Sequence, residues 1–187
     1  MANTASNVTA GKPKIGGAIY AAPKGTTLPT DTSTALAAAF KCLGYVSDSG
    51  LTNTTDLETT DVKAWGGDTV LNIQTSKDDK FAFTLIEVLN EDVLKFVYGS
   101  TNVSGSLASG LSITVNNKDV EEVALVVDMV LRDNTAKRIV VPDCKISELG
   151  DVVYTDSEAV GYETTVTCMP DASGNTHYEY LKKTASA

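Results

Sequence analysis

The sequence is poor in the residues that build catalytic and metal-binding sites. It contains one histidine, His177, and three cysteines, Cys42, Cys144 and Cys168, with no Cys-x-x-Cys pair. A zinc site needs several cysteine or histidine ligands at short spacings, and this chain does not offer them. Triad chemistry needs a nucleophile beside the histidine, and no Gly-x-Ser-x-Gly motif occurs. We therefore expect a protein that is not an enzyme and holds no metal or cofactor, with small buried cysteines and a surface histidine.

Carboxylate side chains are the remaining candidates for a metal-binding or catalytic site. Asp56, Glu58 and Asp61 lack the spacing of a calcium-binding loop, so we interpret them as part of a solvated acidic loop. Glu87 and Asp128 are candidates for the acid pair of a glycoside hydrolase. Sugar binding would need aromatic platforms, however, and the chain has a single tryptophan. We expect Asp128 instead to line a polar interface or a pore.

Positive charge is scarce. The chain has 15 lysine and arginine residues against 24 aspartate and glutamate residues, which gives a formal net charge of −9. This balance argues against binding to nucleic acid or to anionic membranes, because both need clustered bases. An acidic surface can still let DNA pass without sticking to it.

Long apolar runs are missing as well. No stretch approaches the ~20 apolar residues that span a bilayer, so we expect no membrane insertion. The first residues, MANTASNVTAGKPKIGG, lack the apolar core of a secretory signal.

Alternation of apolar and polar residues is the main pattern that the sequence does show. The 187 residues fit one domain, residues 1–187, with 1–14 as a flexible N-terminal arm and 182–187 as a frayed C-terminus. The segments that alternate with the period of strands are 15–21, 40–47, 62–65, 70–75, 80–88, 111–115, 122–131, 138–146, 162–168 and 177–181. The sequence therefore predicts a mainly β domain with a sandwich-like or barrel-like fold.

The segment 121–146 is the most hydrophobic part of the chain. Residues 123–131 are apolar at nearly every position, and a strand that is apolar on both faces is covered on both sides. We expect the cover to be a helix or a neighbouring subunit. Pro142 cannot donate a hydrogen bond to a ladder, so it lies on an edge strand or in a bulge.

One short helix is predicted near residue 90. Asn90 is a suitable N-cap, and Glu91 and Asp92 place negative charge in the first turn, where the helix dipole favours it. Gly99 supplies a left-handed stop. The apolar stripe at helical spacing consists of Leu89, Val93, Phe96 and Val97. A helix of this length is unstable alone, so we expect it to pack on the flank of the sheet.

Residues 48–61 form the longest central stretch without hydrophobic periodicity. Their Thr, Asn, Asp and Ser side chains favour local hydrogen bonds over a strand ladder. A loop of this length is uncommon in a compact domain unless it is functional. We interpret it as a protruding loop that contacts another subunit. Trp65, beside two glycines, is an anchor either in the core or at an interface.

The order of features from Cys42 to Gly99 resembles that of the major tail proteins, or tail tube proteins, of long non-contractile-tailed bacteriophages. The similar stretches are GYVSDSGLT, KAWGGD and KFAFTLIEVLNEDVLKFVYG, with GAIYAAPKGTTLPTD upstream and the hydrophobic hairpin downstream. The resemblance implies a tail tube fold with one helix on its flank. It brings no catalytic residues.

The resemblance also implies a function. Subunits of that family form hexameric rings that stack into a tube, assembled in the host cytoplasm and carried in the virion, through which DNA passes to the host. The implied partners are other copies of the chain and tail proteins such as the tape measure and the tail terminator, with no specific DNA binding. The candidate subunit-interface residues are Asp48, Leu51, Asp56, Leu57, Glu58, Asp61 and Trp65, with Lys12, Lys14 and Lys24 facing the acidic loop of a neighbour.

A second reading is a monomeric β-sandwich binding module of the carbohydrate-binding or adhesin type. Such a module needs an aromatic platform, and aromatic residues make up only 6% of this chain. A stable monomer that binds glycans would favour this reading over self-assembly.

Overall fold

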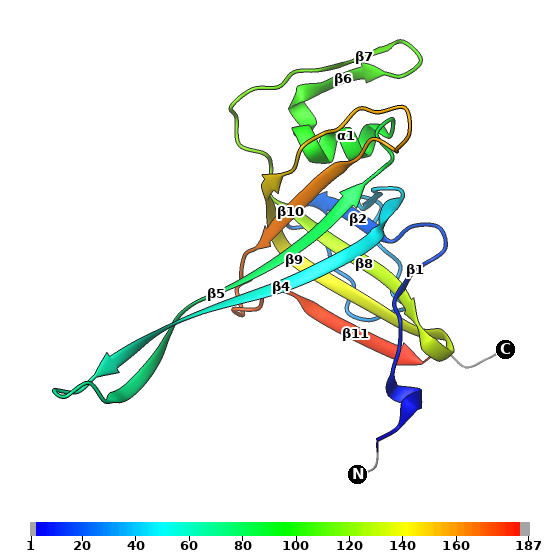
Figure 1. Cartoon of the computed structure of the whole chain (residues 1–187). Helices are drawn as coiled ribbons and strands as arrows, with labels where there is room; N and C mark the ends of the chain where they lie inside the picture. The colour runs from blue at the N-terminus through cyan, green and yellow to red at the C-terminus, as the bar shows by residue number, and fades with distance from the viewer. Residues whose placement is uncertain (1–2, 184–187) are drawn as a thin grey trace.

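The computed structural model describes residues 3–183 and has a mainly β fold with one α-helix among them (Figure 1). The strands are β1 Lys12–Pro13, β2 Ile19–Pro23, β3 Lys41–Cys42, β4 Val46–Lys63, β5 Thr69–Leu85, β6 Val103–Ser106, β7 Gly110–Ile113, β8 Val123–Leu131, β9 Thr135–Leu149, β10 Tyr162–Cys168 and β11 Tyr178–Lys183. Helix α1 spans Glu91–Tyr98, and three short 3-10 turns span Ala5–Asn7, Ser100–Asn102 and Arg132–Asn134.

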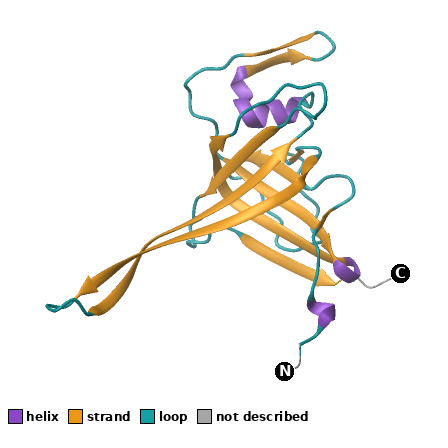
Figure 2. Cartoon of the chain, viewed as in Figure 1, coloured by secondary structure: helices purple, strands orange, loops and turns teal. Residues whose placement is uncertain are grey.

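Nine of the strands form one curled antiparallel sheet (Figure 2). Its main path runs β3-β2-β8-β9-β10-β5-β4, while β1 pairs with β8 and β11 pairs with β9. Strands β6 and β7 form a separate hairpin beyond α1. The fold class expected from the sequence, a mainly β and barrel-like domain with one short helix on its flank, is confirmed.

The core lies mainly between the concave sheet and α1. Alternate residues of β5, β8 and β9 point into it, among them Phe83, Leu125 and Val141, and the helix contributes Val93 and Val97 on its buried side. The helix is confirmed, because the Asn90 side chain accepts a hydrogen bond from the Asp92 backbone N–H at 3.0 Å and Gly99 ends the helix with φ 92°. Leu89 was expected on the apolar stripe but is 69% exposed.

A second, smaller apolar cluster covers the opposite face of β8 and β9. Ala124, Val126 and Val140 are buried there against Phe40 and the partly buried Leu36, both from the segment between β2 and β3. The chain therefore covers both faces of its most hydrophobic strand itself. The expected helix cover is met on one face, where α1 lies in the core cluster with β8, whereas an irregular segment of the same subunit, rather than a helix or a neighbouring subunit, covers the other face.

A buried ion pair fastens this covering segment to the sheet. The Arg138 guanidinium donates to both carboxylate oxygens of Asp128, from Nε at 2.6 Å and from Nη2 at 2.8 Å, and its Nη1 donates to the backbone carbonyls of Asp31 and Thr34. Hydrogen bonding to Asp128 raises the pKa of Arg138. Asp128 is 5% exposed, so it lines neither a pore nor an interface, in contrast to the sequence prediction.

Glu87 and Gly44 also have structural roles. The Glu87 carboxylate accepts hydrogen bonds from the Tyr45 backbone N–H at 2.9 Å and from the Asn90 side chain at 3.0 Å. Gly44 has φ 71°, and a Cβ there would lie 2.1 Å from the Glu87 carboxyl carbon. Glu87 thus joins the start of β4 to the helix cap, and it is not paired with Asp128.

Pro142 lies beside an irregularity in the ladder between β8 and β9. The register shifts between Val123, which opposes Cys144, and Leu125, which opposes Val141. Two residues of β9, Pro142 and Asp143, therefore stand against the single Ala124 of β8, which places Pro142 in a bulge rather than on an edge strand.

The segment 48–61 is not a loop. It lies within β4, which pairs with β5 along almost its whole length, and the two strands extend from the sheet as a long β-hairpin (Figure 1). The sequence prediction failed for residues 48–61 because both faces of this part of β4 are largely exposed to solvent, so no apolar alternation marks it. The many threonines that suggested a loop are also good strand formers. The protrusion itself is confirmed.

The two chain ends are more ordered than expected within the described residues. Lys12 and Pro13, assigned to a flexible arm, form β1 and lie opposite Val130 and Met129 of β8. Residues 182 and 183, assigned to a frayed tail, belong to β11. The remainder of that predicted tail, 184–187, and residues 1–2 lie outside the described residues.

Candidate assembly surfaces

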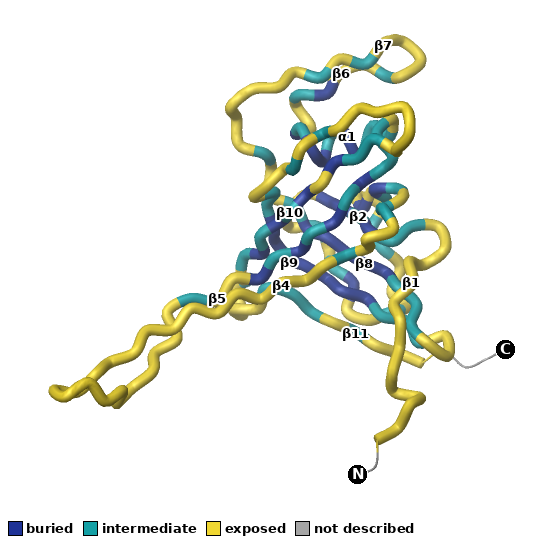
Figure 3. The backbone as a smooth tube through the Cα atoms, in the orientation of Figure 1, coloured by how far each residue is buried: buried dark blue, intermediate teal, exposed yellow. Residues whose placement is uncertain are grey.

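The most conspicuous surface feature is the outer part of the β4–β5 hairpin, residues 55–79, which we call the arm. Strand β10 pairs with β5 only as far as Lys80, which lies opposite Thr167. Beyond this point, β4 and β5 pair only with each other among the described strands. At about 3.3 Å per residue, the arm extends roughly 30 Å from the sheet. Figure 3 shows it as almost entirely exposed.

The far end of the arm carries apolar side chains in solvent. Trp65 is fully exposed in the turn, where the Gly67 N–H donates to the Ala64 carbonyl at 3.0 Å. Val62 and Leu71 lie directly opposite each other next to this turn and are 41% and 53% exposed. We call Val62, Trp65 and Leu71 the arm tip. Trp65 is therefore not a core anchor.

The other arm residues predicted at an interface differ in their surroundings. Asp56 pairs with Lys80 of its own hairpin at 3.2 Å, while Leu57 is 59% exposed. Glu58 is exposed opposite Ser76, at a register shift. Asp61 is exposed and accepts a hydrogen bond from Asn72 at 2.7 Å, so these acids share the hairpin with mostly polar neighbours.

Two predicted interface residues lie at the root of the hairpin, outside the arm. Leu51 opposes Phe83 and packs partly against the core. Asp48 lines a shallow acidic pocket of about 510 Å³ together with Asp151 and Glu158. These positions belong to the body of the subunit, so the structure does not bring all the predicted residues together.

The three lysines predicted to meet the acidic segment of a neighbour lie apart from one another. Lys24 bridges Glu122 at 2.7 Å and Asp143 at 2.5 Å, and hydrogen bonding to these two carboxylates raises its pKa to about 12. Lys14 lies 3.4 Å from the carboxylate of the buried Asp128. Both therefore have acidic partners in their own subunit, whereas Lys12 is exposed in β1.

A buried carboxylate marks the base of the arm. Asp79 is 1% exposed and accepts hydrogen bonds from the hydroxyl of Thr55 at 2.5 Å and from the hydroxyl of Thr176. Burial alone would raise the pKa of Asp79, but these hydroxyls and the charge of Lys77 outweigh it and hold the pKa below its ordinary value. His177 lies 3.7 Å from Asp79, only 19% exposed, so it is not the surface residue expected from the sequence.

This cluster is the contact that the sequence reading missed. Asp79 belongs to one arm strand, Thr55 to the other, and Thr176 to the segment before β11. The hydrogen bonds therefore fix both strands to the body where the paired sheet ends. The polar run SKDDK gave no signal that one of its carboxylates is buried, because Thr55 precedes Asp79 by 24 positions and Thr176 follows it by 97.

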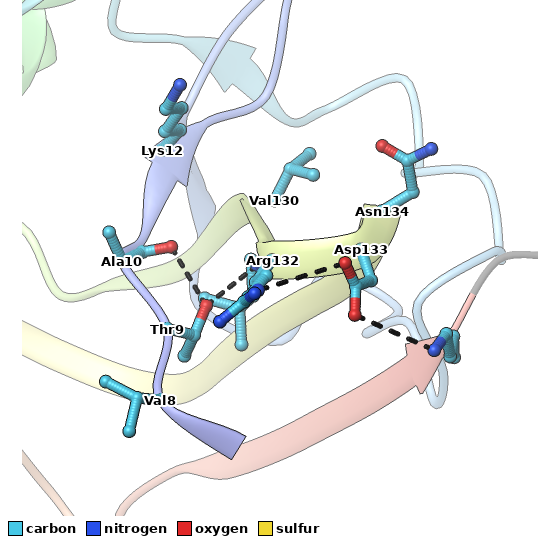
Figure 4. Close-up of a pocket in the computed structure, with 10 residues that line it drawn as sticks. Val8, Thr9, Ala10, Lys12, Val130, Arg132, Asp133 and Asn134 are labelled. Atoms are coloured by element: carbon cyan, nitrogen blue, oxygen red, sulfur yellow. Dashed lines mark hydrogen bonds and ion pairs between the residues drawn. The ribbon is translucent and has the colours of Figure 1, made fainter. Parts of the chain in front are cut away.

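A large open hollow lies beside the N-terminal segment, and Figure 4 shows the residues that line it. We call it the N-terminal groove, an open cavity of about 950 Å³ between residues 8–12, the end of β8 with the following turn, and Lys183. The Arg132 backbone N–H donates to the Thr9 hydroxyl at 2.7 Å, and its side chain donates to the Ala5 carbonyl at 3.1 Å. These bonds hold the N-terminal segment against the sheet.

Cys144 and Cys168 are buried, as expected from the sequence, whereas Cys42 is only partly buried. Burial raises the pKa of the Cys144 thiol, and that of Cys168 to about 12, so neither is primed as a nucleophile. All three cysteines are free. Within residues 3–183, no three His, Cys, Asp or Glu side chains are grouped to hold a metal ion. No helix in this range is long and apolar enough to cross a membrane.

Comparison with known proteins defines the family. The sequence matches the family described as "Phage tail tube protein" over residues 1–187, which is the whole chain, so the protein belongs to that family. It is therefore a structural component of the phage virion, located in the tail, where it assembles with other tail components. The family resemblance noted from residues 42–99 is confirmed.

Structural comparison gives twelve matching chains. One is the "Cryo-EM structure of the anti-feeding prophage cap (AFP tube terminating cap)", with a TM-score of 0.41 and 7% identity, covering 97% of this chain and 100% of that chain. A similarity this low does not support an inference about function. The comparison with curated proteins gave no significant match.

Proposed function

We propose that the protein polymerises into stacked hexameric rings that form the tube for passage of DNA into the host. The observation that carries the proposal is the arm. An isolated two-stranded hairpin is marginally stable in water, and this one exposes Trp65, Val62 and Leu71 at its end. Contact with another subunit would bury these side chains and stabilise the hairpin. The arm is thus best understood as an inter-subunit contact.

The charge of the subunit supports the same function. A net charge of −9 disfavours adhesion of DNA phosphates, so DNA would slide through the tube without specific binding. The remaining parts of the proposal are partnership with the tape measure and tail terminator proteins, assembly in the host cytoplasm, and the absence of enzymatic activity. Neither the N-terminal groove nor the acidic pocket is lined by an aromatic ring, so no observation favours a carbohydrate-binding module.

Replacement of the arm tests this function. Glu58 and Ser76 oppose each other across the hairpin, so residues 59–75 can be exchanged for Asn-Gly, a dipeptide that closes two-residue hairpins. We expect the wild-type protein to form rings and tubes at raised concentration in negative-stain microscopy. The shortened variant should remain folded, with a cooperative thermal transition followed by circular dichroism, and should stay monomeric.

The outcome can contradict the proposal in two ways. A wild-type protein that stays monomeric at every concentration would refute self-assembly. Tubes of normal appearance from the shortened variant would show that the arm is not an inter-subunit contact.

A further inference from the structure

The N-terminal groove has an unusual charge for this acidic protein. Its lining includes three bases, Lys12, Arg132 and Lys183, and one acid, Asp133. Asp133 lies 4.0 Å from Arg132 and 3.9 Å from Lys183, on an exposed surface where such ion pairs contribute little. The groove therefore keeps an excess of positive charge in a chain whose net charge is −9.

The groove also offers apolar surface. Val8 is 71% exposed on one wall, and Val130 and Leu131 of β8 contribute to the other. A hollow of about 950 Å³ is at the large end of the ~300–1,000 Å³ range that encloses a compact ligand, so it has room for an indole ring and its neighbours.

The arm has the complementary properties. Residues 55–79 contain six acids and two bases, and the apolar tip projects beyond them. Within one subunit the arm and the groove lie on opposite sides of the sheet, and the arm extends away from the groove (Figure 1). The arm cannot fill the groove of its own subunit, so an occupant with these properties would come from a second copy.

We propose that the arm tip of one subunit lies in the N-terminal groove of a neighbouring subunit, with the arm carboxylates facing Lys12, Arg132 and Lys183. This inference rests on the proposed self-assembly and adds the receiving surface. It replaces the sequence-based pairing of the acidic segment with Lys14 and Lys24, whose charges are satisfied inside the subunit. Lys12 is the one residue of that group which the groove retains.

Trp65 provides a direct readout, because it is the one tryptophan of the chain and is fully exposed in the free subunit. We expect its fluorescence emission to shift to shorter wavelength when the wild-type protein assembles. The variant K12E/K183E should lose this shift, and its critical concentration for assembly should rise at least about tenfold at low salt.

Two further variants make the test specific. The control K41E/K118E makes the same change in net charge on exposed lysines outside the groove and should assemble as the wild type does. Adding E58K/D61K on the arm to K12E/K183E should restore assembly and the blue shift. Circular dichroism and the Tm of each variant establish that it is folded.

The failures are distinguishable. Wild-type tubes without a Trp65 shift, or a groove variant that assembles normally, would leave the proposed function intact and overturn the groove as receptor. Equal loss in K41E/K118E, or no rescue by the arm substitutions, would also overturn it. A wild-type protein that never assembles would remove the proposed function and this inference together.

Discussion

At the scale of single residues, buried polar groups are paired between different strands and segments of this protein. Asp128 and Arg138 meet under the segment between β2 and β3, and Asp79 meets Thr176 at the base of the arm. Removing one member of such a pair leaves an uncompensated polar group, which costs more than the net contribution of the intact pair.

The Asp128–Arg138 pair should therefore show strong coupling. We expect D128L alone to lower the free energy of unfolding by about 3–5 kcal/mol, because it leaves the guanidinium buried without its carboxylate. The double variant D128L/R138M should recover a large part of that loss. Urea denaturation of the two single variants and the double variant measures the coupling, and strictly additive losses would contradict it.

Asp79 should make the stability depend on pH. Because its pKa is lowered in the folded state, the stabilisation is present above the unfolded pKa of about 4 and is lost as the pH falls through the folded value. We expect the free energy of unfolding of D79N to be lower than that of the wild type at neutral pH, with the difference shrinking in acid. Denaturant titrations from about pH 3 to pH 7 test this, and a constant difference would contradict it.

At the scale of elements, the helix was predictable and the arm was only partly so. The capping residues of α1 are adjacent in sequence, so Asn90 and Gly99 identify both of its ends. The arm contains cross-strand pairs such as Val62–Leu71, which lie on two different strands. The sequence of one strand alone does not identify its partner when both faces of the hairpin are exposed to solvent. Its polarity revealed that it protrudes but not that it is a hairpin.

The helix cap gives a prediction at this scale. N90A removes the hydrogen bond to the Asp92 N–H and the one to Glu87, and should lower the free energy of unfolding by about 1–2 kcal/mol. N90S keeps a capping oxygen and should recover part of this loss. Thermal or urea unfolding distinguishes the two, and equal stability of N90A and the wild type would contradict the role of the cap.

At the scale of the whole molecule, the sequence was sufficient for the fold class and the family but not for the surfaces. The three lysines near the N-terminus look like one basic patch in the sequence, yet the fold pairs Lys24 with Glu122 and Asp143 and leaves only Lys12 beside the groove. The other bases of the groove, Arg132 and Lys183, come from the opposite half of the chain. Local charge patterns cannot predict such a surface, because the topology of the sheet creates it.

Strand β4 leaves an unpaired sheet edge on the free subunit. It ends the sheet order, so one side of an 18-residue strand is open to pairing with any other strand. Open edges of this kind lead to fibres unless charged side chains oppose them. The acids spaced along β4 repel a second copy that approaches edge to edge. The polar composition of β4 therefore disfavours non-specific edge-to-edge aggregation of free subunits.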